Sequence, residues 1–272
     1  MFFFGRTLAG GRQVRSIQFF KYSGNGNDFI ILDHPAVIPS VSLIQQMCHR
    51  HTGIGADGVL VLTSQNGVDG RMRIFNADGG EAEMCANGLR CLFTYVDTQS
   101  AVKKDSYQLA TMNGIYQGLK RQDSFAIEMS EIKEKNRFQS PFQEYDKSFF
   151  INTGVPHLIL LGTEIHKIDI QSALRKYRYH PVFPTGSNVS LVEITDMNLQ
   201  KAYVRTYERG VEGETYSCGT GLTATSQALA EWFGWKGTIT LETKGGEHKL
   251  ELGEKVLFSG QVKFCFQGEY PL

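Results

Sequence analysis

The chain has no long hydrophobic run and no surplus of charge of either sign. Its 272 residues contain no unbroken apolar stretch near the ~20 residues that a membrane-spanning helix needs, so no membrane attachment is expected. Lys and Arg together number 28, as do Asp and Glu, and a formal net charge of zero provides no basic field for a phosphate backbone. We therefore expect neither a membrane nor a nucleic acid as a partner.

Cysteine is sparse as well, with five copies spread widely along the chain. A chain of this length does not need disulfide staples, so the pattern indicates thiols in a reducing cytoplasm. The segment Cys48-His49-Arg50-His51 contains metal-binding residue types, but adjacent side chains project in different directions. No second ligand pair has suitable spacing, and no metal site is predicted.

The first fifteen residues carry three arginines and no acidic residue. Transit peptides have a similar composition, but this stretch is short. We expect residues 1–16 to be a disordered overhang ahead of a first strand at Ile17–Lys21.

Four blocks of sequence occur twice, in the same order, in the two halves of the chain. The matched pairs are Phe19–Leu32 with Phe149–Leu161, Thr52–Val61 with Thr185–Val192, Arg71–Asn76 with Ala202–Glu208, and Met84–Leu89 with Ser217–Leu222. Four matches in one order indicate a duplicated domain, and the chain is long enough for two.

Each half has the pattern of short β-branched or aromatic strands around one apolar helix. Apolar or small residues recur at helical spacing in both halves: Leu89, Leu92, Phe93 and Val96, then Leu222, Ser226, Leu229, Ala230 and Phe233. We predict an α/β (α+β) fold of two pseudo-symmetric domains. Each would be a central helix wrapped by mainly antiparallel strands, with the active site at the domain interface.

The charged run Glu131–Arg137 interrupts the strand pattern and suggests where the first domain ends. We assign residues 17–132 to an N-terminal domain and 133–261 to a C-terminal domain. The last segment alternates like a strand from Val262 and has no counterpart at the end of the first half. We expect this strand, 262–272, to return to the first domain.

Cys85 and Cys218 occupy the same place in the two repeats, at the first turn of the core helix. The positive end of a helix stabilises a thiolate, and its unpaired N–H groups bind anions. Ala86-Asn87-Gly88 and Gly219-Thr220-Gly221 would thus hold a substrate carboxylate between two sulfurs. Inverting a stereocentre needs a base on one face and an acid on the other, so we predict one thiolate base and one thiol acid.

A lone cysteine at a helix start is more often a small core residue than a catalyst. Equivalence across the repeat raises Cys85 and Cys218 above that alternative. Cys91, Cys48 and Cys265 have no such equivalence and are interpreted as packing residues.

Five motifs resemble diaminopimelate epimerase, from about Ile17 to the C-terminus. They are Gly24–Phe29, Phe75–Gly79, Cys85–Cys91, Glu208–Gly210 and Cys218–Gly221. The resemblance implies two similar α/β domains, no pyridoxal phosphate or other cofactor, no metal, and a thiolate-thiol pair at the domain interface. It also implies a cytoplasmic isomerase of amino-acid biosynthesis, inverting LL-2,6-diaminopimelate to the meso form that serves as lysine and peptidoglycan precursor.

The resemblance also assigns roles to residues at matching positions. Cys85 and Cys218 would be catalytic, while His157 and Glu208 would tune the cysteine pKa values. The implied substrate-binding residues are Asn27, Asn76, Ala86, Asn87, Asn188, Glu208, Arg209, Gly219 and Thr220. For His157, a hydrogen-bonded structural histidine is the alternative, and a homodimer is left open.

The sequence departs from the family pattern near the site. Ala86 stands where Gly is common, Val155 where Asn is common, and Gly58 where Gln is common. The loop after Arg209 is one residue longer than usual. These differences leave open a broader racemase that also accepts a simpler acidic amino acid such as glutamate. The remaining alternatives are a proline racemase, a non-catalytic module that binds an anion, and a thiol-disulfide role in which the two helix-start cysteines oxidise.

Overall fold

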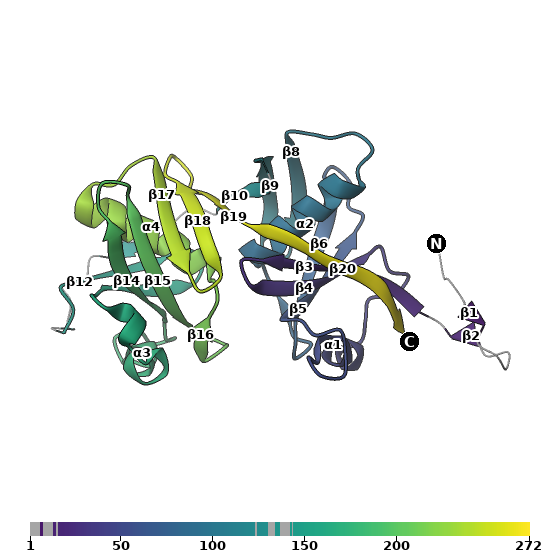
Figure 1. Cartoon of the computed structure of the whole chain (residues 1–272), viewed down its shortest axis with the longest axis horizontal. Helices are drawn as coiled ribbons and strands as arrows, with labels where there is room; N and C mark the ends of the chain where they lie inside the picture. Colours follow the sequence, from purple (N-terminus) through teal and green to yellow (C-terminus); the bar gives the residue numbers. More distant parts are fainter. Residues whose placement is uncertain are drawn as a thin grey trace. The chain divides into compact units, whose positions relative to one another are not determined.

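The computed structural model describes residues 6–7, 13–14, 16–122, 124–129, 134–136, 142 and 144–272. The chain forms two compact units, which Figure 1 shows: Met1–Phe125 with Val262–Leu272, and Ala126–Gln261. The expected boundary between residues 132 and 133 falls within 130–133, which lie outside the described residues. The predicted domain limits therefore stay a prediction.

Two short strands precede the first unit's sheet. β1 (Arg6–Thr7) and β2 (Gln13–Val14) pair antiparallel with each other. Residues 1–5, 8–12 and 15 of the expected overhang lie outside the described residues.

The first unit is a mixed sheet with two helices. Its elements are β3 (Ser16–Gly24), β4 (Asn27–Asp33), α1 (Val41–Cys48), β5 (Gly58–Thr63), β6 (Gly70–Asn76), β7 (Glu81–Ala82), α2 (Ala86–Gln99), β8 (Ser106–Thr111), β9 (Gly114–Lys120) and β20 (Val262–Pro271). The strands pair in the order β20, β3, β4, β5, β6, β8, β9, with β7 also against β6. The pairs β4–β5 and β6–β8 are parallel, and the others are antiparallel.

The second unit repeats this topology. Its elements are β11 (Glu134–Asn136), β12 (Lys147–Asn152), β13 (Pro156–Leu161), the 3-10 helix η1 (Ile165–Lys167), α3 (Ile170–Arg178), β14 (Asn188–Asp196), β15 (Lys201–Glu208), β16 (Gly213–Thr215), α4 (Gly219–Phe233), β17 (Thr238–Thr243), β18 (Gly246–Glu251) and β19 (Leu257–Gly260). Again two pairs are parallel, β13–β14 and β15–β17, at the same places in the order. β10 (Phe125–Glu128) pairs with β19. The predicted duplication is confirmed.

The outermost strand differs in origin between the two units. In the second unit β11 pairs with β12, and it comes shortly before β12 in sequence. In the first unit the corresponding partner of β3 is β20, the last strand of the chain. This is the segment that the alternation from Val262 indicated as a returning strand.

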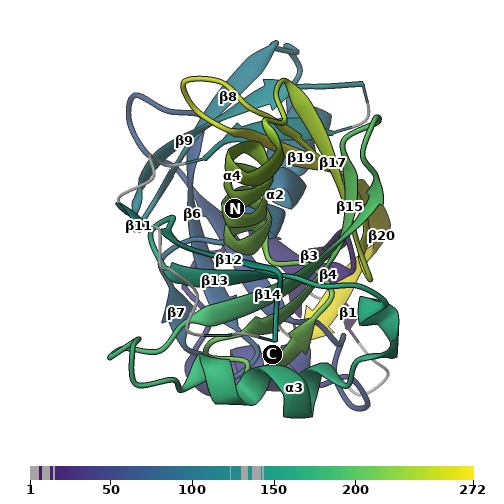
Figure 2. The ribbon, with the colours of Figure 1, turned by 90° about the vertical axis from the view of Figure 1, so that its left-hand side faces the viewer.

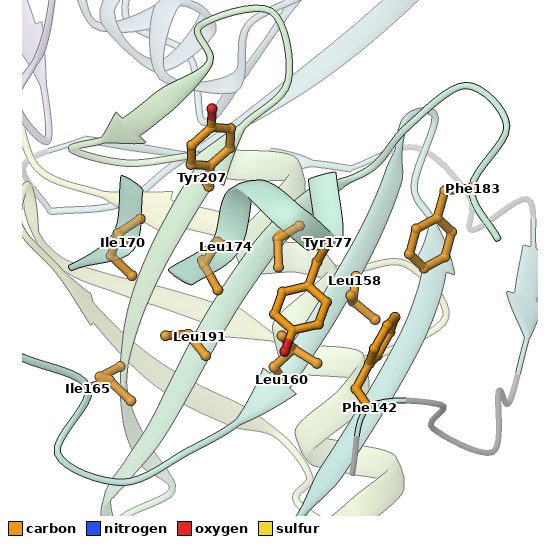
Figure 3. Close-up of a cluster of buried hydrophobic side chains, with 11 residues drawn as sticks. Phe142, Leu158, Leu160, Ile165, Ile170, Leu174, Tyr177, Phe183, Leu191 and Tyr207 are labelled. Carbon is orange, nitrogen blue, oxygen red and sulfur yellow. The ribbon is translucent and has the colours of Figure 1, made fainter. Parts of the chain in front are cut away.

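Alternation along the strands decides which side chains reach the central helix of the second unit. Figure 3 shows the opposite face, where buried side chains of β13 and β14 pack with α3. That cluster consists of Phe142, Leu158, Leu160, Ile165, Ile170, Leu174, Tyr177, Phe183, Val189, Leu191 and Tyr207. Because successive side chains of a strand alternate, His157, Asn188 and Glu208 lie on the face that carries α4. Figure 2 shows α4 with strands of its unit around it.

The first unit has the same division. A buried cluster on the α1 face contains Phe19, Ile30, Leu32, Ile44, Met47, Cys48, Ala56, Val59, Val61 and Phe75. Asn27, Gly58 and Asn76 alternate with members of that cluster, so they lie on the α2 face. α2 contacts β3, β4, β5, β6 and β8, and its side chains Leu89, Leu92 and Phe93 are fully buried. A central helix wrapped by strands is therefore observed in each unit.

Two of the three cysteines predicted to be packing residues are buried. Cys48 lies in the α1 cluster, and Cys91 is fully enclosed in α2. The prediction for Cys265 is wrong, because this thiol is exposed on β20. Cys265 is the residue left out of the register between Phe264 and Phe266, where β20 is irregular against β3. Among the helices described here, none is long and apolar enough to cross a membrane.

Candidate active site

Cys85 is the residue at which α2 begins. Its backbone is extended, with φ −141°, and its carbonyl accepts the first helical bond from the Leu89 N–H at 2.9 Å. In α1, by contrast, the hydroxyl of Ser40 caps the helix by accepting from the Leu43 N–H at 3.3 Å. Within the described residues no side-chain cap hydrogen bond forms at Cys85. The first-turn amides of α2 therefore remain suited to an anion.

Two asparagines meet at the Cys85 sulfur. The Cys85 Sγ lies 3.6 Å from Asn27 Oδ1, as donor, and Asn87 Nδ2 donates to the same oxygen at 3.4 Å. The close approach of β3 to α2 needs glycine at position 24, because a Cβ there would lie 3.0 Å from Asn87 O and 3.1 Å from Cys91 Sγ. Three residues predicted for the site are thus brought together in the first unit.

Asn76 and Ala86 are the other predicted substrate-binding residues of the first unit. Asn76 ends β6 and is exposed, opposite Gly58 in the strand register. Ala86 is buried in the first turn of α2. A Cβ at Gly58 would lie 2.5 Å from the Phe75 carbonyl oxygen, so any side chain there would require the backbone of β5 or β6 to shift.

Cys218 begins α4 in the same manner as Cys85 begins α2. It has an extended backbone with φ −119°, and its carbonyl accepts from the Leu222 N–H at 2.9 Å. Its sulfur lies 3.5 Å from the Thr220 hydroxyl. At Gly221 a Cβ would lie 3.3 Å from this sulfur and 3.4 Å from His157 Cε1, so the glycine admits His157 beside the helix start.

Asn188, Glu208 and Arg209 surround the end of β15. Asn188 is buried and bridges two strands, donating to Pro156 O at 3.0 Å and accepting from the Arg209 N–H at 2.7 Å. Arg209 Nη1 donates to Thr185 O at 3.1 Å. Burial raises the pKa of Glu208, and a hydrogen bond with Cys218 opposes that shift. A hydrogen bond that lowers a carboxyl pKa stabilises the ionised form, so in this contact the Glu208 carboxylate accepts from the Cys218 thiol.

The longer loop after Arg209 is tied to α3 by Glu212. Arg178 Nη2 donates to Glu212 at 2.8 Å, and the Tyr179 hydroxyl donates at 2.7 Å. Despite a burial penalty, these two donors lower the pKa of Glu212 to about 2. The loop that carries Arg209 is thus anchored by an ionised carboxylate.

His157 is fully buried, and neither of its ring nitrogens has a hydrogen-bond partner among the described residues. The hydrogen-bonded structural histidine considered as the alternative is therefore not observed. Burial, together with the charge of Arg209, lowers the pKa of His157 to about 3. The imidazole beside the α4 start is neutral at physiological pH.

This burial should make stability depend on pH. His157 has a pKa of about 3 in the folded chain and near 6.5 when unfolded, so between these values the unfolded state binds the extra proton. The free energy of unfolding should therefore fall by about 2 kcal/mol from pH 7.5 to pH 5 through this residue. In His157→Leu, urea unfolding at the two pH values should show a difference smaller by that amount. The exposed His51→Leu is the control, and an unchanged difference in His157→Leu would contradict the prediction.

An ion pair that sequence analysis missed is repeated in both units. Arg73 Nε and Nη2 donate to the two carboxylate oxygens of Glu81 at 2.7 Å each. Arg205 Nε and Nη2 donate to Glu214 at 2.6 and 2.9 Å. Each glutamate lies four positions before its helix-start cysteine, so each pair ties the approach to that cysteine to the central sheet. The sequence signal that could have revealed these ion pairs is that Glu81 and Glu214 occupy matching positions in the two repeats.

Comparison with known proteins agrees with this architecture. The diaminopimelate epimerase family model matches residues 19–131 and 149–261. The diaminopimelate epimerase of Methanocella arvoryzae is 35% identical, covering 94% of this chain and 97% of the relative. That of Archaeoglobus fulgidus is 36% identical, covering 93% and 95%.

Solved structures with the same fold are more distant in sequence. A phenazine biosynthesis protein of the PhzF family from Enterococcus faecalis has a TM-score of 0.73 at 14% identity, covering 94% of this chain and 100% of the other. A probable proline racemase from Agrobacterium radiobacter has a TM-score of 0.66 at 15% identity, covering 93% and 92%. These likenesses concern the fold.

The predicted fold class, two repeats of a mixed sheet with few helices, is confirmed by these comparisons. The predicted enzyme class, an isomerase, is confirmed by the curated relatives. The chain belongs to the diaminopimelate epimerase family.

Proposed function

We propose that the chain inverts one α-carbon of LL-2,6-diaminopimelate to give the meso form, with Cys85 and Cys218 acting on opposite faces. The observation that carries this proposal is that both cysteines begin the central helix of their unit, in equivalent places of a duplicated topology. The named relatives at 35 and 36% identity support the substrate.

The proposed reaction is a proton exchange with no change of oxidation state. One cysteine, as thiolate, removes the α-proton, and the other, as thiol, delivers its proton to the opposite face. The helix-start amides of α2 and α4 would hold the α-carboxylate and stabilise the negative charge that develops on it. Residues of both units would then face one substrate, with the active site at the domain interface and no cofactor in the reaction.

Further side chains have roles that suit a doubly charged amino acid. We assign substrate binding to the set predicted from sequence: Asn27, Asn76, Ala86, Asn87, Asn188, Glu208, Arg209, Gly219 and Thr220. Arg209 would pair with a carboxylate and Glu208 with an ammonium group, since a guanidinium can grip a carboxylate with two parallel bonds. His157, neutral and buried at the α4 start, and Glu208 would tune the titration of Cys218. We place the reaction in the cytoplasm.

Incubation with diaminopimelate in deuterated water tests this function. An epimerase must exchange the α-hydrogen for solvent deuterium as LL-diaminopimelate becomes the meso isomer, which NMR and chiral chromatography detect. Glutamate is the comparison substrate. Exchange with diaminopimelate alone supports the proposal, and equal kcat/KM for glutamate would replace it with a broader racemase. Binding without any exchange would leave a non-catalytic module.

A further inference from the structure

Asp57, which was not among the residues predicted for the site, lies directly behind Asn27. Its Oδ2 accepts from Asn27 Nδ2 at 2.8 Å and from the Asp28 N–H at 3.1 Å. Its Oδ1 accepts from Arg50 Nη2 at 2.6 Å. Both carboxylate oxygens are therefore held in place by donors, so the carboxylate presents a fixed acceptor to Asn27.

The support behind Asp57 is an ion-pair network. Arg50 also donates to Asp28 Oδ1 at 2.8 Å, and Lys21 donates to Asp28 Oδ2 at 2.5 Å. Although burial opposes it, these two cations lower the pKa of Asp28 to about 2. Asp28 therefore stays ionised through the neutral pH range, and Arg50 bridges it to Asp57, which keeps one orientation.

The side-chain amides of Asn27 and Asn87 are hydrogen-bonded to each other, between the Asp57 carboxylate at one end and the Arg90 guanidinium at the other. These two charged groups fix the direction of both amides. A carboxylate only accepts, so the Asn27 amide must turn its NH2 group to Asp57 and its carbonyl oxygen away. At the other end Arg90 Nη2 donates to Asn87 Oδ1 at 2.9 Å, so Asn87 must turn its own NH2 group to Asn27. The Asn27 oxygen therefore faces Asn87 and the Cys85 sulfur. If the amide were reversed, its oxygen would face the Asp57 carboxylate and its NH2 group would face the NH2 group of Asn87.

A carbonyl oxygen beside the sulfur favours one protonation state. It accepts a hydrogen bond from the Cys85 S–H and repels a thiolate. Arg90 on α2 interacts electrostatically with Cys85, and the Asp57 carboxylate lies on the far side of Asn27. Cys91 on α2 stays neutral because burial raises the pKa of its thiol.

Among the described residues of the second unit, no equivalent arrangement occurs at Cys218. In the matched strands Val155 stands at the position of Asn27, and Ser187 at that of Asp57. The Cys218 sulfur lies 3.5 Å from the Thr220 hydroxyl, which can donate as well as accept, and it also forms a hydrogen bond with Glu208. The two sulfurs therefore have different hydrogen-bonding surroundings.

We propose that Asp57 is a positioning residue for Cys85, acting through Asn27, whose carbonyl oxygen it turns to the sulfur and so stabilises the thiol over the thiolate. The proposal depends on the proposed function where it treats Cys85 as a reacting group. The thiol titration itself can be measured without substrate, so its failure is separate from failure of the epimerase assay.

The substitution Asp57→Asn should reverse the Asn27 amide. Arg50 would donate to the carbonyl oxygen of the new asparagine side chain. The NH2 group of that asparagine would then face Asn27. The Asn27 oxygen would turn to that group, because the contact with residue 57, at 2.8 Å, is closer than the 3.4 Å contact with Asn87 Nδ2 that the turn gives up. The Asn27 NH2 group would then be a donor to the Cys85 sulfur. A donor stabilises the thiolate, so Cys85 should ionise at lower pH.

The test is the pH dependence of iodoacetamide alkylation at Cys85, followed by mass spectrometry of its peptide. Asp57→Asn should move the midpoint down by at least half a pH unit, about a threefold shift in the ionisation constant. Removing the carboxylate charge alone would also lower the midpoint, so the same substitution is made in an Asn27→Ala background. Positioning through Asn27 requires that the effect disappear there.

Two outcomes overturn the proposal. The midpoint does not move in Asp57→Asn, or it moves equally with and without Asn27, which would make Asp57 a purely electrostatic neighbour. Thermal melting of each variant confirms that it is folded. If Asn27→Ala does not fold, Asn27→Ser, which also lacks the amide, replaces it in the cycle.

Discussion

Replacing Cys85 or Cys218 by alanine should each lower kcat for inversion of diaminopimelate about 1000-fold or more. A positioned acid or base contributes about 100-fold to 10000-fold to a proton transfer, and inversion needs one group on each face. Rates are measured by chiral chromatography of the product and by deuterium incorporation from solvent. KM should change much less than kcat, because the helix-start amides that would bind the carboxylate remain.

Cys91→Ala is the matched control for these variants. Cys91 lies on the same helix as Cys85, but it is fully buried, and burial raises the pKa of its thiol far above neutrality. Its replacement should reduce stability slightly and leave kcat within about twofold of the parent, since it contributes no proton transfer. Full activity in either the Cys85 or the Cys218 variant would refute the two-cysteine mechanism.

Glu214→Gln should destabilise the chain by about 3 kcal/mol, whereas Glu81→Gln should cost less than about 1 kcal/mol. The two glutamates make the same ion pair in the two repeats, and burial separates them. The side chains of Arg205 and Glu214 are 9% and 16% exposed, against 32% and 25% for Arg73 and Glu81. Removing one partner of a buried pair leaves a charge without compensation, whereas water can reach and solvate the charge left in the partly exposed pair.

Urea unfolding at neutral pH measures both variants. Arg205 keeps its bonds from Nη1 to Ile165 O and Ile168 O, each at 2.7 Å, so the guanidinium should stay in place while losing its counter-charge. Lys244 also donates to Glu214, and Lys244→Ala tests whether that exposed partner contributes. Equal losses in the two glutamate variants would show that burial does not set the strength of these pairs.

The duplicated fold could be predicted because repetition is visible in the sequence. Matches such as Arg71–Asn76 with Ala202–Glu208 place the same strand twice, and the structure pairs both strands in the same manner. The two helix starts were predictable for the same reason. The family motifs then supplied residues such as Asn27 and Asn188, which periodicity alone does not distinguish from turn or core residues.

Contacts between distant parts of one unit could not be predicted. Asp57 contacts Asn27 because the parallel strands β4 and β5 begin side by side. No spacing in the sequence predicts that contact. The buried, unbonded state of His157 depends on Gly221 admitting its ring beside α4. The prediction of Cys265 as a packing residue depended on its lack of an equivalent in the repeat, and the sequence does not show that it lies at a register irregularity of β20 with its thiol exposed.

The pairing of β20 with β3 has a consequence for the order in which the chain is made. β3 is translated before the second unit, and its partner from Val262 to Pro271 is translated after it. While the second unit is being translated, β3 of the first unit has an unpaired edge. Unpaired strand edges of this kind allow nascent chains to associate wrongly. Of these two units the one begun earlier is therefore completed later, and a ribosome that stops before Val262 releases a chain in which β3 lacks its partner.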